Sequence, residues 1–91
     1  LTELPAEVAH WTKVKKMFLN GNRLSALPAA IGGWELLEKL YVNDNALTAL
    51  PDEIGALTNL QELYLNKNQL SQLPAALERL RDLDKLYLMD N

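Results

Sequence analysis

The amino-acid sequence predicts an α/β repeat solenoid, in which one short structural unit is stacked on copies of itself. The 91-residue chain repeats with a period of 23 residues, without insertion or deletion. A fixed period of roughly 20 to 50 residues is the mark of a repeat architecture. Each repeat opens on a Leu-Pro pair, which suits the first turn of a short helix. Each repeat then contains an alternating apolar segment, which is typical of a strand.

Two phrases carry this periodicity. The first has the form Leu-x-x-Leu-x-Leu-x-x-Asn-x-Leu, and it occurs as VKKMFLNGNRL at residues 14–24, LEKLYVNDNAL at 37–47, LQELYLNKNQL at 60–70 and LDKLYLMDN at 83–91. The second, Leu-Pro-x-x-Ile-Gly in its fullest form, begins at Leu4, Leu27, Leu50 and Leu73. Four copies in register make the signal specific to one architecture.

These phrases predict a single domain, 1–91, of about four repeats. Its divisions are a tail of a preceding repeat at 1–3, repeats at 4–26, 27–49 and 50–72, and an incomplete repeat at 73–91. Neither end carries the polar capping unit that solenoids need. We therefore expect a window from a longer array. The alternative is a complete protein that covers its ends by self-association.

In each helical turn, apolar residues spaced three apart should point into the stack. Trp11 and Trp34 occupy the column held elsewhere by Leu57 and Leu80, so both are expected to fill the core. The column that contains Gly32 also contains Ala9 and Glu78 in other repeats. Glycine is therefore expected to be useful in that column, at Gly55 as well, but not required.

In the strand of the third repeat, alternation places Leu63 and Leu65 inside and Glu62 and Tyr64 outside. Strands of successive repeats should pair in parallel, about 4.8 Å apart. An asparagine follows each strand, where a buried amide can bond both its own turn and the adjacent repeat. The predicted structural asparagine ladder consists of Asn22, Asn45 and Asn68.

Composition excludes several classes of function. The net charge of −3 disfavours a nucleic-acid partner, because phosphate binding needs clustered lysine and arginine. No apolar run is long enough to span a membrane. The chain has no cysteine, which permits the cytosol and does not exclude secretion. His10 has no nucleophile near it, and residues 43–45 are too few for a calcium loop. We predict no enzyme activity, no metal and no cofactor.

The repeated phrases resemble the conserved segment of leucine-rich repeats, in the 23-residue subclass of Ras-suppressor-like scaffolds, Roco proteins and many bacterial proteins. The resemblance implies a right-handed superhelix, or horseshoe segment. It also implies a short parallel sheet on the concave face and short helical or 3₁₀ turns on the convex face. It implies a protein–protein interaction module.

The concave face should carry an aromatic column flanked by charged residues. The predicted partner-binding residues are Phe18, Tyr41, Tyr64, Tyr87, Lys16, Lys39, Glu62 and Lys85. Tyrosine is enriched at recognition surfaces because it buries a large area with little loss of rotamer freedom. The competing interpretation is that the column only stacks across the strands. A second alternative makes the repeats the targeting arm of a larger enzyme, such as a ubiquitin ligase effector, a receptor kinase or a Roco GTPase. A third is a spacer without a partner.

Overall fold

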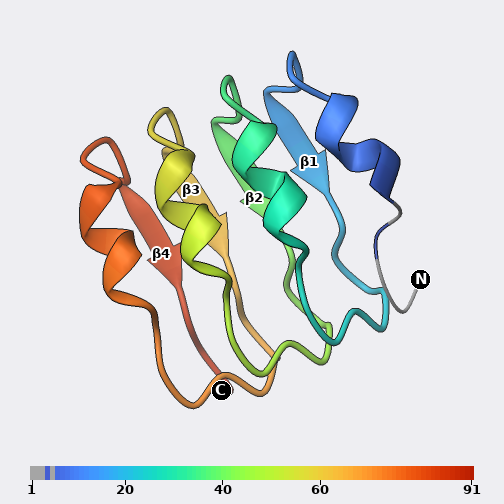
Figure 1. The fold of residues 1–91 in the computed structure, drawn as a ribbon. Coiled ribbons are helices and arrows are strands. Elements are labelled where there is room, and N and C mark those ends of the chain that lie inside the picture. The colour runs from blue at the N-terminus through green and yellow to red at the C-terminus, as the bar shows by residue number, and fades with distance from the viewer. Residues whose placement is uncertain (1–3, 5) are drawn as a thin grey trace.

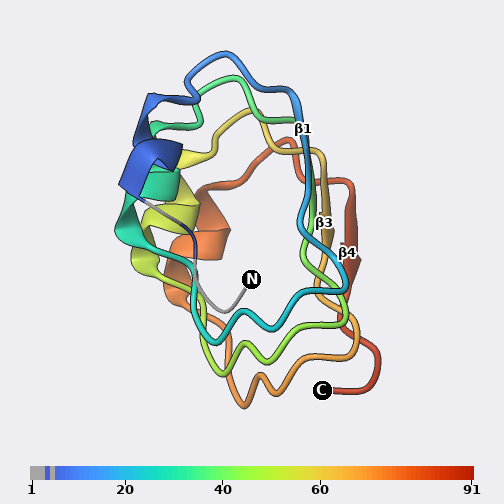
Figure 2. The same ribbon diagram turned by 90° about the vertical axis from the view of Figure 1, so that its right-hand side faces the viewer.

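The computed structural model describes residue 4 and residues 6–91. Four 3₁₀ helices alternate with four short strands along the chain (Figure 1). In order, the elements are η1 (Ala6–His10), β1 (Lys16–Phe18), η2 (Ala29–Gly33), β2 (Lys39–Tyr41), η3 (Asp52–Ala56), β3 (Glu62–Tyr64), η4 (Ala75–Arg79) and β4 (Lys85–Tyr87). Seen along the stack in Figure 2, the helices form one wall of the solenoid and the strands form the opposite wall.

The helical turns start where the Leu-Pro pairs predict. Pro28, Pro51 and Pro74 each precede a 3₁₀ helix in an extended conformation. The residue that follows each helix donates its N–H to the carbonyl three residues earlier. For example, the Trp34 N–H donates to the Ile31 carbonyl at 3.0 Å, and the Leu57 N–H to the Ile54 carbonyl at 3.2 Å. The expected short helical segment is therefore a 3₁₀ helix in all four repeats.

The four strands form one parallel sheet in the order β1-β2-β3-β4. The register pairs Met17 with Leu40, Leu40 with Leu63 and Leu63 with Leu86. Each partner lies 23 residues along the chain, so the sequence period and the strand register are the same quantity. This confirms the predicted parallel pairing.

Most of the predicted core is buried, but only one of the two tryptophans is part of it. Trp34 is fully buried, and its indole Nε1 donates a hydrogen bond to the Val8 carbonyl at 2.8 Å. Trp11 is 38% exposed, so the expectation that both tryptophans fill the core is wrong for Trp11. The reason is position, because Trp34 packs between repeats whereas no described residue packs over the outer side of Trp11.

The two end faces differ from each other. On the fourth repeat Leu86 is 38% exposed, and Leu77, Leu83 and Leu88 are only partly buried. On the first repeat Leu4 and Val8 are buried within the core, although no capping unit precedes them in the sequence. The second repeat covers them, as the Trp34–Val8 hydrogen bond shows. The fourth repeat is thus the more open end.

For the 91-residue chain in isolation, we expect either self-association through its end faces or fraying of residues 83–91. Grouped exposed apolar side chains favour a partner, and open strand edges invite strand addition. Sedimentation at increasing concentration measures the first outcome. Hydrogen exchange measures the second, with residues 60–70 as the internal reference. A monomer with uniform amide protection through Met89 would contradict both.

A close approach between helices makes glycine necessary at one convex position. A Cβ added to Gly55 would lie 2.8 Å from the Ala76 carbonyl oxygen and 2.9 Å from the Ala76 Cβ. A Cβ on Gly32 would meet the Glu53 Cβ at 3.4 Å, which is a tight contact that a small shift relieves. The expectation that glycine is not required in this column is therefore wrong for Gly55. Glu78 occupies the column on η4, over which no described helix packs.

Candidate functional site

The outward side chains of the four strands form a surface that we call the sheet face. It consists of three columns, Lys16, Lys39, Glu62 and Lys85; Phe18, Tyr41, Tyr64 and Tyr87; and Asn20, Asn43, Asn66 and Met89. All eight predicted partner-binding residues lie on this face, in the order that the register requires. The strands that carry them are adjacent in the sheet, so the predicted columns are continuous.

The aromatic column is a stack of nearly parallel rings. The ring centroids of Phe18 and Tyr41 lie 4.6 Å apart, those of Tyr41 and Tyr64 4.4 Å, and those of Tyr64 and Tyr87 4.8 Å. The planes of neighbouring rings differ by 9° to 12°. Because each inner ring is covered on both faces, a partner would meet ring edges and hydroxyl groups there. Phe18 is 64% exposed and offers a larger apolar contact at one end.

A hydrogen-bonded cluster lies at the middle of the sheet face. The Tyr64 hydroxyl donates to Glu62 Oε1 at 2.5 Å, and the Lys39 Nζ lies 3.4 Å from Glu62 Oε2. The Tyr64 hydrogen bond, together with Lys39, lowers the pKa of the Glu62 carboxyl below its ordinary value. The same hydrogen bond raises the pKa of the Tyr64 hydroxyl. Glu62 is therefore a carboxylate at neutral pH, and it forms an ion pair with Lys39.

Sequence reasoning named these three residues but missed their mutual bonds. The signal was present in two spacings. Glu62 and Tyr64 are two residues apart on one strand and so share a face, while Lys39 and Glu62 are 23 residues apart and so are direct neighbours across the sheet. Opposite charges in that register predict an ion pair.

The third column is amide-rich and less regular. The Asn43 Nδ2 donates to the Asp44 carboxylate at 3.1 Å. Among the described residues, the buried Oδ1 of Asn66 has no hydrogen-bond partner. Met89 is 69% exposed and replaces the amide in the fourth repeat. The column therefore changes from polar to apolar along the stack.

The asparagine ladder makes the bonds expected of it. Asn68 Nδ2 donates to the carbonyl of Leu65 in its own repeat and to that of Val42 in the preceding repeat, both at 3.0 Å. Its Oδ1 accepts from the Leu47 N–H at 3.1 Å. Asn45 and Asn91 repeat this arrangement with the same sequence offsets. Asn22 donates to the Leu19 carbonyl at 2.9 Å. Each amide thus satisfies backbone groups of its own repeat, and Asn45, Asn68 and Asn91 also those of the preceding one.

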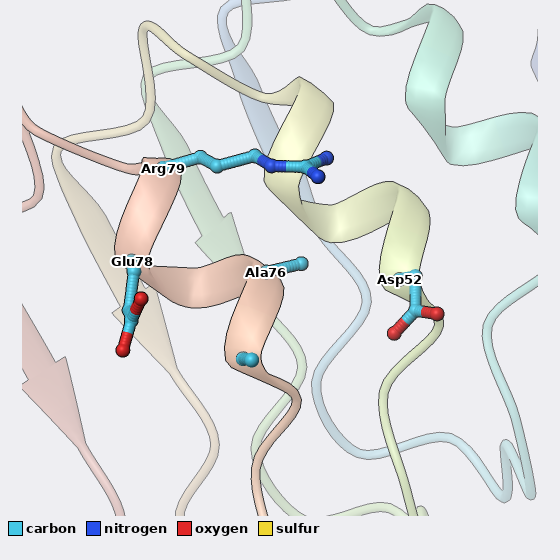
Figure 3. A pocket seen from close by; sticks show the side chains of 5 residues that line it. Asp52, Ala76, Glu78 and Arg79 are labelled. Atoms are coloured by element: carbon cyan, nitrogen blue, oxygen red, sulfur yellow. The ribbon is translucent and has the colours of Figure 1, made fainter.

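The helix side carries an open groove between η3 and η4, of about 380 Å³. It is lined by Asp52, Ala75, Ala76, Glu78 and Arg79. In Figure 3 the Arg79 side chain extends from η4 toward η3, and Asp52 lies at the other end of the groove. The lining contains no cysteine, serine or histidine that could serve as a nucleophile or a base. No sequence pattern indicated this groove.

Residue 4 and residues 6–91 contain no group of three or more histidine, cysteine, aspartate or glutamate side chains that could hold a metal ion. No helix among these residues is long and apolar enough to cross a bilayer.

The stacked strands, 3₁₀ turns and asparagine ladder define a leucine-rich repeat solenoid. A family model described as "Leucine rich repeat" matches residues 35–91, which is more than half of the chain. The chain belongs to the leucine-rich repeat family. Domains of this kind are typically protein-interaction modules and are usually not catalytic. A comparison with curated proteins finds no match.

Solved structures support the same fold. A leucine-rich repeat protein of Leptospira interrogans superposes with a TM-score of 0.94 and 39% identity, over 97% of this chain and 22% of that one. An internalin of Listeria monocytogenes superposes with a TM-score of 0.75 and 26% identity, over 91% of this chain and 24% of that one. The leucine-rich repeat domain of the type III effector XopL superposes with a TM-score of 0.66 and 24% identity, over 98% of this chain and 41% of that one. At this identity the likeness shows the fold alone. The chain thus spans less than a quarter of the first two proteins.

Proposed function

We propose that this chain is a protein–protein interaction module that holds a partner on its sheet face. The observation that carries the proposal is the stacked aromatic column, which crosses all four strands and is flanked by lysine side chains. Tyrosine presents a rigid contact area with an attached hydrogen-bonding group, and it is enriched at interfaces for that reason. The column is already ordered by stacking, so binding would cost little side-chain entropy.

The size of the sheet face limits the affinity of this chain alone. Twelve outward side chains on four short strands cover an area on the order of a few hundred Å², whereas a standard interface buries about 800 Å² on each partner. We therefore expect these repeats either to supply part of a larger footprint or to bind weakly by themselves.

The double variant Tyr41→Ala/Tyr64→Ala should lose most of its partner binding. Truncation of buried interface aromatics typically costs about 2 kcal/mol or more. Affinity capture from a lysate of the source organism, compared between wild type and variant, measures the loss. Asp52→Ala/Glu53→Ala on η3 is the matched control, because it changes two exposed residues on the helix side. Thermal melting establishes that each variant is folded. Undiminished capture by the tyrosine variant would move the site to the helices or the loops.

The alternative proposal treats these repeats as the targeting arm of a larger enzyme, such as a ubiquitin ligase effector, a receptor kinase or a Roco GTPase. It rests on the resemblance to the leucine-rich repeat family alone, and no residue of this chain carries it. The residues flanking 1 and 91 in the parent gene would decide it. A catalytic domain there would support the alternative, and further repeats alone would oppose it.

The spacer interpretation predicts that substituting the aromatic column removes no interaction at all.

A further inference from the structure

The sheet face has a charge opposite to that of the rest of the molecule. Three of the nine basic residues and one of the twelve acidic residues lie on it. Its formal charge is therefore +2 within a chain of net charge −3, which leaves −5 on the remainder. The acidic remainder repels anions over most of the surface, and the positive sheet face attracts them at one place.

The positive charge is concentrated on the outer strands. Glu62 on β3 is paired with Lys39 on β2 at 3.4 Å, and this is the only ion pair among the described residues. These two charges largely cancel at the centre of the strip. Lys16 on β1 and Lys85 on β4 are exposed, and no described carboxylate lies within ion-pair distance of either.

The separation of the two lysines fits an extended chain that crosses the strands. Lys16 and Lys85 are in the same column on the first and last strands, three strand spacings apart, or about 14 Å. An extended segment rises about 3.3 Å per residue, so residues i and i+4 lie roughly 13 Å apart. Side chains of an extended segment alternate, so i, i+2 and i+4 point to the same side. Residue i+2 would then face the neutral Lys39–Glu62 pair.

From this geometry, and resting on the function proposed above, we infer that the sheet face binds an extended acidic segment of a protein partner. Carboxylates at positions i and i+4 contact Lys16 and Lys85, and an uncharged residue at i+2 lies over the central pair. The hydroxyls and ring edges of the aromatic column, which lies beside the lysines, provide further contacts to the bound segment. The segment runs across the strands, because only this direction reaches both lysines.

The probe is a library of random nine-residue peptides displayed on phage, selected on the folded 91-residue chain. We expect enrichment of aspartate or glutamate at i and i+4, with an uncharged residue between them. Lys16→Glu/Lys85→Glu should enrich lysine and arginine at these positions instead. The same variant should bind a synthetic acidic peptide about tenfold more weakly than the wild type does, because exposed ion pairs are of modest strength. High salt should weaken the wild-type complex for the same reason.

Arg23→Glu/Lys67→Glu is the matched control, because it changes the net charge equally at two exposed loop positions outside the sheet face. It should keep the acidic preference. Unchanged peptide enrichment on Lys16→Glu/Lys85→Glu would overturn the inference. If Tyr41→Ala/Tyr64→Ala nevertheless abolished that enrichment, the sheet face would remain the binding site and only the acidic partner would be wrong. If neither double variant altered the selection, the proposed function would fail as well.

Discussion

Replacing Trp34 with alanine should lower the free energy of unfolding by about 3–5 kcal/mol, the usual cost of truncating a large buried aromatic side chain. Trp34 is fully buried, and its Nε1 donates to the Val8 carbonyl at 2.8 Å. The substitution leaves a cavity at the junction of the first two repeats and removes one of the two donors to the Val8 carbonyl, which keeps its bond from the Trp11 N–H. Urea denaturation measures the change. A loss of this size is a large fraction of the stability of a typical small domain, so the midpoint of unfolding should move to a much lower urea concentration.

Trp11→Ala is the matched control, because Trp11 occupies the same column one repeat earlier and is 38% exposed. Part of its apolar area is in water already, so its truncation removes less burial. Trp34→Phe separates the two effects at Trp34, since it keeps an aromatic ring and removes the donor. Equal destabilisation by Trp11→Ala and Trp34→Ala would contradict the assigned packing.

Asn68→Ala should destabilise the chain by about 1–3 kcal/mol, more than the size of the side chain suggests. The Asn68 amide donates to the carbonyls of Leu65 and Val42 and accepts from the Leu47 N–H. Alanine leaves the Leu47 N–H unpaired at a site that is 6% exposed. The Leu65 and Val42 carbonyls each lose one of two donors and keep the bond from a neighbouring ladder asparagine. Asn45→Ala should act in the same direction, because its amide makes the corresponding bonds. Thermal melting gives the shift.

Asn66→Ala controls for the loss of an asparagine two positions earlier. The Oδ1 of Asn66 is buried without a partner among the described residues, so alanine removes an unsatisfied acceptor instead of a bonded one. We expect little loss of stability or a small gain. If Asn66→Ala and Asn68→Ala lowered the melting temperature equally, the structural role of the ladder would be refuted.

The repeat period predicts much of this fold because period and register coincide. Once Met17, Leu40 and Leu63 are aligned in sequence, they are aligned in space, and the positions of the tyrosines and the ladder follow. The position of a residue in a repeat column does not reveal whether another repeat packs against it on both sides. For that reason Trp11 and Trp34 look alike in sequence and differ in burial. The need for glycine at Gly55 depends on how closely the Ala76 backbone approaches, which a sequence pattern does not contain.

The candidate site divides in the same way. The columns of the sheet face could be predicted residue by residue. The parallel stacking of the rings and the hydrogen bond from Tyr64 to Glu62 depend on side-chain rotamers, on which the pattern is silent. The partner-binding role of the face stays a prediction, because a stacked column serves both strand stability and recognition.

The identical offsets of the ladder bonds have a consequence for how such a chain evolves. Asn45, Asn68 and Asn91 each reach carbonyls three and 26 residues earlier and accept from an N–H 21 residues earlier. Unequal recombination that adds or removes one whole 23-residue segment therefore recreates the same junction between new neighbours. The number of strands can drift in unit steps over generations while the local bonding stays constant. Each step adds or removes one strand, with one ring of the aromatic column and one residue of the column that contains Lys16. Duplication can therefore change the size and charge of the sheet face before any point mutation occurs.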